Sequence, residues 1–599
     1  MRFPLALALM LPLAACVPTD EFDAPVQHQT HVEDWRDEVI YQLMVDRFAN
    51  GDRNNDYNVT LNDDVLARYQ GGDYQGVIDQ VEYLEALGVT AVWVSPIVVN
   101  VEEDAGISSY HGYWTQDFEG VNPHFGDITS FRRMVDVLHE HDIKVILDVV
   151  TNHVGQLFYY DINRNGQPDT TIYGGGGRDS EPDFWKDPIE VITEWDPQYD
   201  GRGVQGWTSL GESGPAPLVW VRMPEINRIP PEPAVFHNDD WYNRRGRVID
   251  WNDLEQVERG DFPGGLKDLD TTNPEVRDAL IDVFQGWITR TDIDGFRIDT
   301  VKHVDHAFWQ QFAPAMRQHA AELGKDNFLL FGEIFDGNDA LIGSYTFDGE
   351  LDSAFWFSQK FQVYDDVFKR GQPTTQVESL FTGRATNYGA VPHANGIGVP
   401  PQQALVNFMD NHDVPRFLFD APGGEAALKA GLVFLLTEDG IPCIYYGTEQ
   451  GFTGGNDPAN REPLWWSDYR TDGDVFQHIA GLTRVRRTYT ALTRGSLVFR
   501  WTSPRVDGEE DAHILAYERM HDDGNVLVVI NTGDDGTAHT QYQSSPMPVS
   551  FSPGTVLVPA FPPGDDRRFT VDGSGAVRVE VGAFEGLVLV PEDALIPIE

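Results

Sequence analysis

Two charged side chains, Arg297 and Asp299, mark the stretch of sequence best suited to chemistry. They lie in Gly295-Phe-Arg-Ile-Asp-Thr-Val-Lys-His303, where Phe296 and Ile298 predict a buried strand. Residues two apart on a strand point to the same side, so the guanidinium would lie beside the carboxylate and favour its ionised form. An ionised, oriented carboxylate is a nucleophile or a metal ligand. A purely structural ion pair at the strand end is the alternative that this segment leaves open.

Short apolar strands alternate with amphipathic helices on both sides of this stretch. Helices are predicted next to it at residues 274–292 and 306–323, where apolar residues recur with helical spacing. The same alternation predicts strands at residues 39–48, 90–94, 143–150, 328–333, 404–411 and 441–446, and helices at 76–88, 128–141 and 424–436. It indicates an α/β fold with a parallel sheet, and about eight such units predict a closed (β/α)8 TIM barrel.

Two regions depart from this alternation. Residues 153–270, rich in Gly, Pro, Asp and Trp, predict an irregular insertion after the third strand that could wall a cleft. Residues 496–599 change to short strands separated by turns, which predicts a C-terminal all-β domain, expected to be a β-sandwich. The barrel is therefore expected to span residues 35–495, with the insertion inside it.

The N-terminus has the pattern of a targeting signal. Residues 1–16 combine Arg2, an apolar run and the lipobox-like Leu13-Ala-Ala-Cys16, which predicts an exported lipoprotein of the bacterial cell envelope, lipidated at Cys16. A plain secretory signal and a secreted protein are the alternative. Residues 17–34 are polar and predict a tether. With Cys16 used for the anchor, only Cys443 remains, so no internal disulfide is expected.

The charge of the chain limits its partners. It carries 95 acidic and 43 basic residues, a formal net charge of −52. Such a chain is repelled by nucleic acid and by anionic membrane surfaces, so no nucleic-acid partner is expected and membrane contact only through the lipid anchor. Its 41% hydrophobic content is typical of a globular protein, which we expect to be a monomer.

The predicted strands end in polar residues. In a parallel barrel the active groups lie at the carboxyl ends of the strands, so these side chains are expected to share one rim. They are Asp148, Asn152, His153, Arg297, Asp299, Glu333, Asp410, Asn411, His412 and Asp413.

Several of these residues belong to motifs that resemble a known family. Asp148-Val-Val-Thr-Asn-His153, the stretch 295–303, Phe331-Gly-Glu-Ile334 and Phe408-Met-Asp-Asn-His-Asp413 are similar to the four signature regions of the α-amylase family, glycoside hydrolase family 13. Supporting stretches at residues 88–96, 109–114, 266–270 and 445–450 also match, and the resemblance covers about residues 35–490 in family order. The resemblance implies a TIM-barrel glycosidase.

The resemblance assigns three carboxylates to catalysis: Asp299 as nucleophile, Glu333 as general acid/base and Asp413 as transition-state stabiliser. In retaining glycosidases two carboxyl groups about 5–5.5 Å apart form and then hydrolyse a covalent glycosyl-enzyme. Their pKa values must differ. Arg297 is expected to keep Asp299 ionised, while apolar neighbours and nearby negative charge keep Glu333 protonated.

The resemblance also implies sugar-binding residues. Two histidines would hydrogen-bond the sugar in the cleaved subsite, a tyrosine would stack on its ring, one Asp–Arg pair would hold a more distant sugar, and one Lys–His pair would line the leaving-group side. The substrate-binding set is Arg297, His153, His412, Tyr113, His111, Trp114, Lys302, His303, Asp457 and Arg461.

Calcium is the expected cofactor, with one to three ions, because Ca²⁺ takes six to eight oxygen ligands and the chain offers three oxygen clusters. The resemblance implies one site from Asn152, Asp268 and the main-chain carbonyl of His303. A second cluster resembles a site of cyclodextrin glucanotransferases: Asn50, Asp52, Asn55, Asp56, Gly71 and Asp73. A third has EF-hand-like spacing but ends at Ile172, which leaves a turn without an ion as the alternative: Asp161, Asn163, Asn165 and Asp169.

The favoured activity is retaining endo-hydrolysis of α-1,4-glucosidic bonds in starch, glycogen or maltooligosaccharides. A transglycosylase of the cyclodextrin glucanotransferase kind is the first alternative, since Phe335 is transferase-like, whereas Gly264 stands where those enzymes have a large aromatic residue. A non-catalytic, lipid-anchored glucan-binding protein is the second. The presence of all three carboxylates argues against it.

Overall fold

The computed structural model describes residues 26–59, 65–104, 106–161, 170–173, 189–192, 206–207, 215–534 and 536–597. The predicted signal peptide with Cys16 lies outside these residues. Of the third calcium cluster only Asp161 is described, and Asn163, Asn165 and Asp169 lie outside as well. Within the described residues, no helix has the length and apolar character needed to cross a bilayer.

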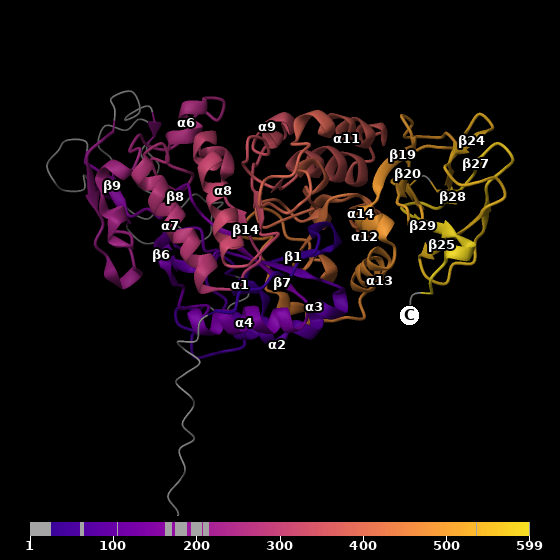
Figure 1. The fold of residues 1–599 in the computed structure, drawn as a ribbon. Helices are drawn as coiled ribbons and strands as arrows, with labels where there is room; N and C mark the ends of the chain where they lie inside the picture. Colours follow the sequence, from indigo (N-terminus) through magenta and orange to yellow (C-terminus); the bar gives the residue numbers. More distant parts are fainter. Residues whose placement is uncertain are drawn as a thin grey trace, which may run out of the picture.

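Eight parallel strands form the centre of the molecule (Figure 1). They are β1 (Ile40–Leu43), β2 (Ala91–Val94), β7 (Lys144–Val149), β14 (Gly295–Ile298), β15 (Leu329–Gly332), β16 (Ser353–Ala354), β17 (Val406–Phe408) and β18 (Ile441–Tyr445). They pair in the order β16-β15-β14-β7-β2-β1-β18-β17. A parallel bridge between Phe355 and Val406 joins the two ends of this order and closes the barrel. The predicted TIM barrel is confirmed.

Helices surround the barrel. The main ones are α2 (Tyr74–Asp79), α3 (Val81–Leu87), α4 (Ile128–Glu140), α7 (Pro274–Arg290), α8 (His306–Glu322), α11 (Thr375–Asn387), α12 (Gly424–Thr437) and α13 (Asp474–Thr488). The helix predicted at 76–88 is two helices that meet at Gln80. The two-residue strand β16 was not predicted, because so short a segment carries no periodic signal.

The first predicted strand, 39–48, was too long. β1 ends at Leu43 and residues Val45–Phe48 form the short helix α1. The reason is local: Asp46 and Arg47 form a buried ion pair at 2.8 Å, and the Asp46 carboxylate accepts the backbone N–H groups of Gln70 and Gly71. These contacts turn the chain out of the barrel.

The helices on either side of β14 have well-defined starts. Asn273 accepts a hydrogen bond from the N–H of Glu275 and Pro274 takes the first position of α7, while Asp305 accepts from Phe308 at the start of α8. Such caps satisfy backbone donors that the helix leaves unpaired. They fix the helices that hold the strand carrying Arg297.

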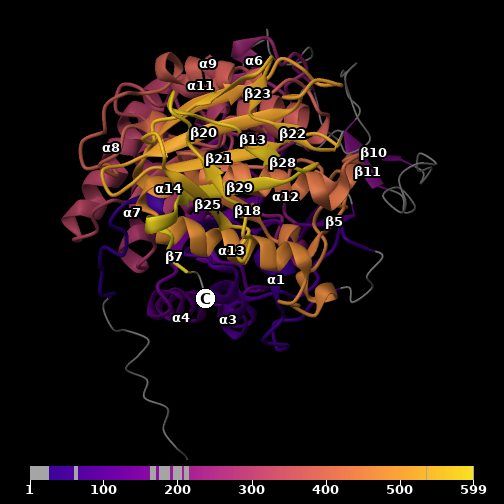
Figure 2. The ribbon, with the colours of Figure 1, turned by 90° about the vertical axis from the view of Figure 1, so that its right-hand side faces the viewer.

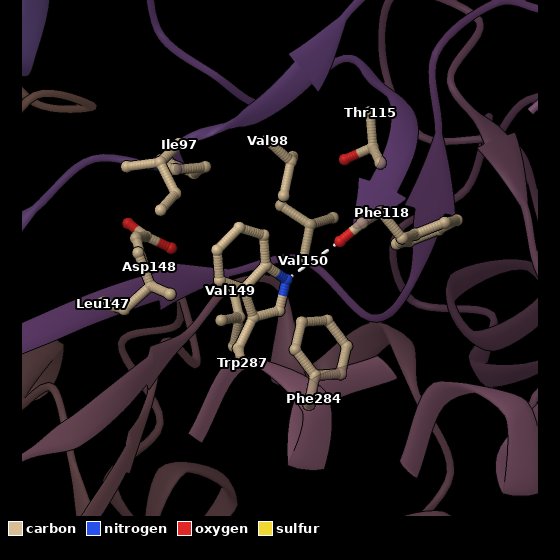
Figure 3. A pocket seen from close by; sticks show the side chains of 11 residues that line it. Ile97, Val98, Thr115, Phe118, Leu147, Asp148, Val149, Val150, Phe284 and Trp287 are labelled. Atoms are coloured by element: carbon tan, nitrogen blue, oxygen red, sulfur yellow. Dashed lines mark hydrogen bonds between the residues drawn. The ribbon is translucent and has the colours of Figure 1, made fainter. Parts of the chain in front are cut away.

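Helix α7 packs on β7 through large side chains (Figure 3). The indole of Trp287 donates a hydrogen bond of 2.9 Å to the carbonyl of Phe118 in β6 (Thr115–Val121), and Phe284 lies beside it. The cavity between these layers has a volume of about 10 Å³ and apolar walls. This space is too small for a ligand, so the layer is structural.

The insertion lies at the opposite end of the molecule from the C-terminal strands (Figure 1). It contains α6 (Leu254–Arg259) and two antiparallel pairs: β8 (His153–Val154) with β13 (Lys267–Asp268), and β9 (Phe158–Tyr160) with β12 (Leu218–Trp220). A buried ion pair at 2.7 Å joins Lys267 of β13 to Asp261 in the segment between α6 and β13.

The C-terminal region is all-β, as predicted (Figure 2). Six antiparallel strands form its main sheet: β19 (Ser496–Thr502), β20 (Ile514–Met520), β21 (Val526–Asn531), β29 (Gly586–Pro591), β25 (Val556–Phe561) and β26 (Phe569–Thr570). Smaller pairings join β22 (Ala538–His539) to β28 (Glu580–Val581), and β23 (Gln541–Tyr542) through β24 (Ser545–Pro548) to β27 (Ala576–Val577). Alternate residues of the main sheet, such as Leu515 and Tyr517, belong to the barrel core, whereas Ile514 and Ala516 belong to a second core within the C-terminal region.

The predicted tether, residues 17–34, is described from residue 26 on, and there it contacts the barrel. Val32 is buried, and the side-chain amide of Asn327 donates to its carbonyl at 2.9 Å. Trp35 is fully buried and donates to the Asn327 carbonyl at 2.7 Å.

A buried cation in α13 joins the barrel to the chain that leads into the C-terminal sheet. Arg486 donates to the carbonyls of Arg36, Leu436, Gly440 and Leu492 at 2.7–3.2 Å. Buried carbonyls need partners, so the guanidinium connects three separate segments of backbone.

Arg486→Met should therefore lower the free energy of unfolding by about 3 kcal/mol, since hydrogen bonds to a charged group contribute about 1.5–3 kcal/mol each and several carbonyls lose their donor. Arg487→Met, on the exposed face of the same helix, is the matched control and should change it by less than about 0.5 kcal/mol. Denaturant unfolding measures both variants. Equal stabilities would contradict this role of Arg486.

Candidate active site

The carboxyl ends of four barrel strands bring the candidate catalytic groups to one rim. Asp148 lies near the end of β7 and Arg297 near the end of β14, directly opposite each other in the parallel register. Asp299 follows β14, Glu333 follows β15, and Asp413 lies in the loop after β17. Residues distant in the sequence thus meet because their strands are neighbours or face one another across the barrel.

Arg297 connects three of these carboxylates. Its Nη1 lies 2.9 Å from both oxygens of Asp148 and 3.0 Å from Oδ1 of Asp299, and its Nη2 lies 2.6 Å from Oε2 of Glu333. The side chain is fully buried. Burial alone would lower the pKa of Arg297, but the surrounding carboxylates raise it well above its usual value. The guanidinium is therefore a fixed positive charge.

Asp148, which orients the Arg297 guanidinium, is itself held by two hydrogen bonds. The indole of Trp93 donates to its Oδ2 at 3.0 Å, and the hydroxyl of Tyr113 donates to the same oxygen at 2.8 Å. Asp148 was predicted to lie at a strand end, with no specific function assigned to it. The sequence showed that Asp148 is an acid within a signature motif, but it did not show that this acid contacts Arg297.

Asp299 and Glu333 differ in their affinity for a proton. Burial, together with the charges of Asp148 and Asp413, raises the pKa of Asp299 to about 6 against the effect of Arg297. Burial raises the pKa of Glu333 to about 8, again against Arg297 and with the help of Asp413 and Asp299. At neutral pH the first is therefore mainly a carboxylate and the second mainly a carboxylic acid.

Asp413 remains ionised at any physiological pH. Burial would raise the pKa of this carboxyl, but His412 and Arg461 outweigh it and hold the pKa well below its usual value. His412 Nε2 lies 3.0 Å from Oδ2 of Asp413, and Arg461 Nη2 lies 3.3 Å from Oδ1. One third of the Asp413 side chain is exposed, so this negative charge faces the open side of the site.

Arg461 also binds the other acid that the resemblance assigns to a distant sugar. Its Nη1 lies 2.9 Å from Oδ1 of Asp457 and donates to the hydroxyl of Tyr110 at 3.1 Å. The Asp457 side chain is half exposed, whereas that of Arg461 is buried. The structure thus brings this pair next to Asp413.

Four aromatic rings pack together on one side of the site. The ring of Tyr113 is parallel to that of His412, with centroids 5.3 Å apart, and His111 stacks against Tyr113 at 5.8 Å. His111 also meets Trp114 edge-on at 4.8 Å. His153 Nε2 lies 3.2 Å from the carbonyl of Tyr113. Five of the predicted sugar-binding residues, Tyr113 among them, are therefore linked by a series of contacts.

Lys302 and His303 are neighbours in the sequence but contact different segments. Lys302 donates to the carbonyl of Phe335 at 2.5 Å, which ties the loop after β15 to the loop after β14. The ring of His303 is buried, its Nδ1 lies 2.9 Å from the carbonyl of Val257, and it meets Trp251 edge-on at 5.8 Å. This geometry gives the His303 ring a packing contact with the insertion.

Three oxygen atoms converge where the insertion joins the barrel. The side-chain oxygen of Asn152 lies 3.1 Å from the carbonyl of His303 and 3.3 Å from Oδ1 of Asp268. If the Asn152 amide were rotated, its nitrogen could donate to the other two oxygens. In the present orientation all three oxygens could instead bind one cation. Asp268 is buried, which raises its pKa well above the usual value, and Asp261 and Asp270 add to the shift. The donor set therefore fits Ca²⁺.

The second predicted calcium cluster comes from two adjacent loops: Asn50, Asp52, Asn55, Asp56, Gly71 and Asp73. Asn50 donates to Asp56 at 2.8 Å, and the side-chain oxygens of Asn50 and Asn55 are buried without a hydrogen-bond partner. Such orphaned acceptors fit a cation. The Asp73 carboxylate caps α2 by accepting the N–H of Gly76 at 2.7 Å, and it also accepts the N–H groups of the 51–52 segment.

Two residues that support the site were not found from the sequence. Gln42 donates to Nδ1 of His412 at 2.6 Å. Asn460 donates to the carbonyls of His412 and Val414 at 2.9 and 2.8 Å. No feature of the sequence distinguishes these two buried amides, so only their contacts in the structure reveal their role.

The site as a whole carries excess negative charge. Its acids are Asp148, Asp299, Glu333, Asp413 and Asp457, and its cations are Arg297 and Arg461. With Glu333 protonated, four negative charges face two positive ones. This arrangement can stabilise positive charge that develops during a reaction, on a ligand that is neutral when it binds.

Comparisons with known proteins agree with this geometry. A model of the α-amylase catalytic domain matches residues 42–495. A β/α-amylase of Paenibacillus polymyxa is 31% identical over 522 residues, 85% of this chain, which spans about a third (34%) of that protein's length. An Anoxybacillus α-amylase structure has a TM-score of 0.68 and 27% identity, covering 93% of this chain and 99% of that one.

A cyclomaltodextrin glucanotransferase with three domains has the same TM-score of 0.68 and 27% identity, covering 92% and 98% of the two chains. Hydrolases and transferases are thus both represented among the similar structures. The family match extends over most of the chain and includes every strand that carries the carboxylates described above. The chain is a member of the α-amylase family of glycoside hydrolases.

Proposed function

We propose that this enzyme hydrolyses α-1,4-glucosidic bonds in starch, glycogen or maltooligosaccharides, acting inside the chain and retaining the anomeric configuration. The observation that supports this most directly is that one guanidinium, Arg297, binds both Asp299 and Glu333. A nucleophile and an acid held side by side in this way suit a double displacement.

In the first step Oδ of Asp299 attacks the anomeric carbon while Glu333 gives its proton to the departing glycosidic oxygen. In the second step Glu333, now a carboxylate, takes a proton from water, which displaces Asp299 and frees the sugar. Asp413 stabilises the oxocarbenium-like charge in between, since its ionised carboxylate faces the open side of the site.

Transglycosylation is the second candidate, and two exposed aromatic rings favour it. Phe335 and Trp251 are 41% and 49% exposed, and they contact Lys302 and His303 respectively. Rings on the leaving-group side could hold an acceptor sugar in place of water. Gly264, whose backbone has φ of +91° and no atom near its absent side chain, leaves that position without a ring. This favours water as the main acceptor.

Calcium belongs to the proposal as a structural ion at Asn152, Asp268 and the carbonyl of His303. When bound, it supplies positive charge that joins the insertion to the barrel. The chain's own residues bring the ligands together: β8 pairs with β13 so that Asp268 lies opposite His153. We also propose that the protein is a monomer, exported and anchored to the cell envelope through Cys16.

Asp299→Asn should lower kcat on soluble starch by about a thousandfold or more, because the variant lacks the attacking carboxylate. Asp282→Asn, on the exposed face of α7, is the control and should keep full activity. Chromatography of the wild-type products separates the two candidates: linear oligosaccharides support hydrolysis, cyclic or elongated ones transfer. A fully active Asp299→Asn variant would contradict the nucleophile assignment.

The pH profile of kcat/KM should be bell-shaped, with limbs near pH 6 and pH 8. Asp299 must be deprotonated to attack, so activity falls as the pH drops through about 6. Glu333 must be protonated to assist departure, so activity falls as the pH rises through about 8. Initial rates on a maltooligosaccharide measure the profile. An alkaline limb that persists unchanged in Glu333→Gln would contradict the assignment of the acid.

Removal of calcium by a chelator should lower the melting temperature, and added calcium should restore it. An ion that binds only the native state stabilises it by about 2.7 kcal/mol at a hundredfold excess over Kd. In Asp268→Asn this response should shrink, whereas Asp282→Asn should respond like the wild type. Differential scanning fluorimetry provides the curves. Identical responses in all three proteins would place the ion elsewhere.

A further inference from the structure

A second cluster of ligand-type side chains lies at the amino-terminal base of the barrel, away from the catalytic rim. It joins His31 of the N-terminal segment, His139 of α4 and Asp292 between α7 and β14. One ligand atom of each residue lies within 4.8 Å of the others. Among the described residues it is the one group of at least three His, Cys, Asp or Glu side chains with such spacing.

The two imidazoles face the same carboxylate oxygen. Oδ2 of Asp292 lies 2.8 Å from Nε2 of His31 and 3.6 Å from Nδ1 of His139. The rings are stacked, with centroids 3.6 Å apart and planes at 23°. The His31 side chain is one-fifth exposed, whereas that of His139 is nearly buried.

A further carboxylate orients His139. Oδ2 of Asp294 lies 2.8 Å from its Nε2 and also accepts the N–H of Val145 at 2.9 Å. When Nε2 donates to Asp294, Nδ1 carries the lone pair and faces Asp292. A ligating histidine whose other nitrogen donates to a carboxylate is the usual arrangement at protein metal sites.

The charge of the cluster leaves room for a cation. Lys325 binds Oδ1 of Asp292 at 2.5 Å and Oδ1 of Asp294 at 3.2 Å, which leaves both Oδ2 atoms to the histidines. Two carboxylates against one ammonium give a net charge of −1. A divalent ion with two neutral imidazoles would change this net charge to +1, so the cluster can take up one such ion without a large excess of either sign.

We propose that His31, His139 and Asp292 bind a transition-metal ion of the Zn²⁺ class, which fastens the N-terminal segment to the barrel base. Two nitrogens and one carboxylate oxygen suit zinc and its neighbours rather than Ca²⁺ or Mg²⁺, which prefer oxygen alone. The partly exposed His31 leaves space for a water molecule as fourth ligand.

The segment that carries His31 already touches the barrel at several points. His28 Nε2 lies 3.0 Å from the carbonyl of Ile288, and Lys325 donates to the carbonyl of Gln29 at 2.7 Å. The ion would therefore strengthen a contact that the protein makes by itself. Its loss should not prevent folding.

The test is cobalt binding to the full chain in saturating calcium. Co²⁺ in a site with two imidazoles and a carboxylate gives a visible absorption band, and one equivalent of Zn²⁺ should remove it. His31→Gln should weaken Co²⁺ binding at least tenfold. His141→Gln, one residue beyond α4 and paired with Glu85 at 3.0 Å, is the matched control and should bind like the wild type.

Two results would overturn the proposal: a wild-type protein without the band, which would mean that the three side chains are only hydrogen-bonded, or equal cobalt affinity in the His31→Gln and His141→Gln variants. Starch hydrolysis should be unchanged in His31→Gln, because His31 lies on the opposite face from the catalytic rim. The result is thus independent of the proposed activity.

Discussion

One buried guanidinium determines how charge is distributed in this active site. Arg297 has no contact with solvent and touches Asp148, Asp299 and Glu333 at once. Without it, three buried carboxylates on adjacent strands would repel each other and take up protons. With it, the strands β7, β14 and β15 can bring their acids to one point. The barrel brings the three carboxylates together, and the positive charge of Arg297 reduces their mutual repulsion.

The same cation does not neutralise all its partners equally. Asp148 takes two contacts from Nη1 and hydrogen bonds from two further donors, Trp93 and Tyr113, although burial still raises its pKa. Asp299 and Glu333 receive less, and burial raises the pKa of both. Burial, offset to different extents by the surrounding charges, thus separates the pKa of the proposed nucleophile from that of the proposed acid.

Much of the fold could be predicted from the sequence because strong periodicity and helix caps are local signals. The helices at 128–141, 274–292, 306–323 and 424–436 have the predicted bounds within two residues. The shortened β1 could not be predicted, since it depends on Asp46 meeting the backbone of residues 70–71. The supporting role of Gln42 likewise exists only through its contact with His412. Motifs therefore predicted the candidate reacting groups, while the residues that hold them could be found only in the structure.

Negative charge is distributed unevenly between the two faces of the barrel, and this has a chemical consequence. At the catalytic rim the ionised Asp413 is one-third exposed, whereas at the base the acids Asp292 and Asp294 are almost fully covered by Lys325 and the two histidines. In the proposed mechanism a neutral glucan approaches the rim without repulsion, and the positive charge that develops during bond cleavage meets the partly exposed carboxylate of Asp413. In that mechanism the excess negative charge of the rim acts in the transition state, where a substrate that is neutral at the start becomes cationic.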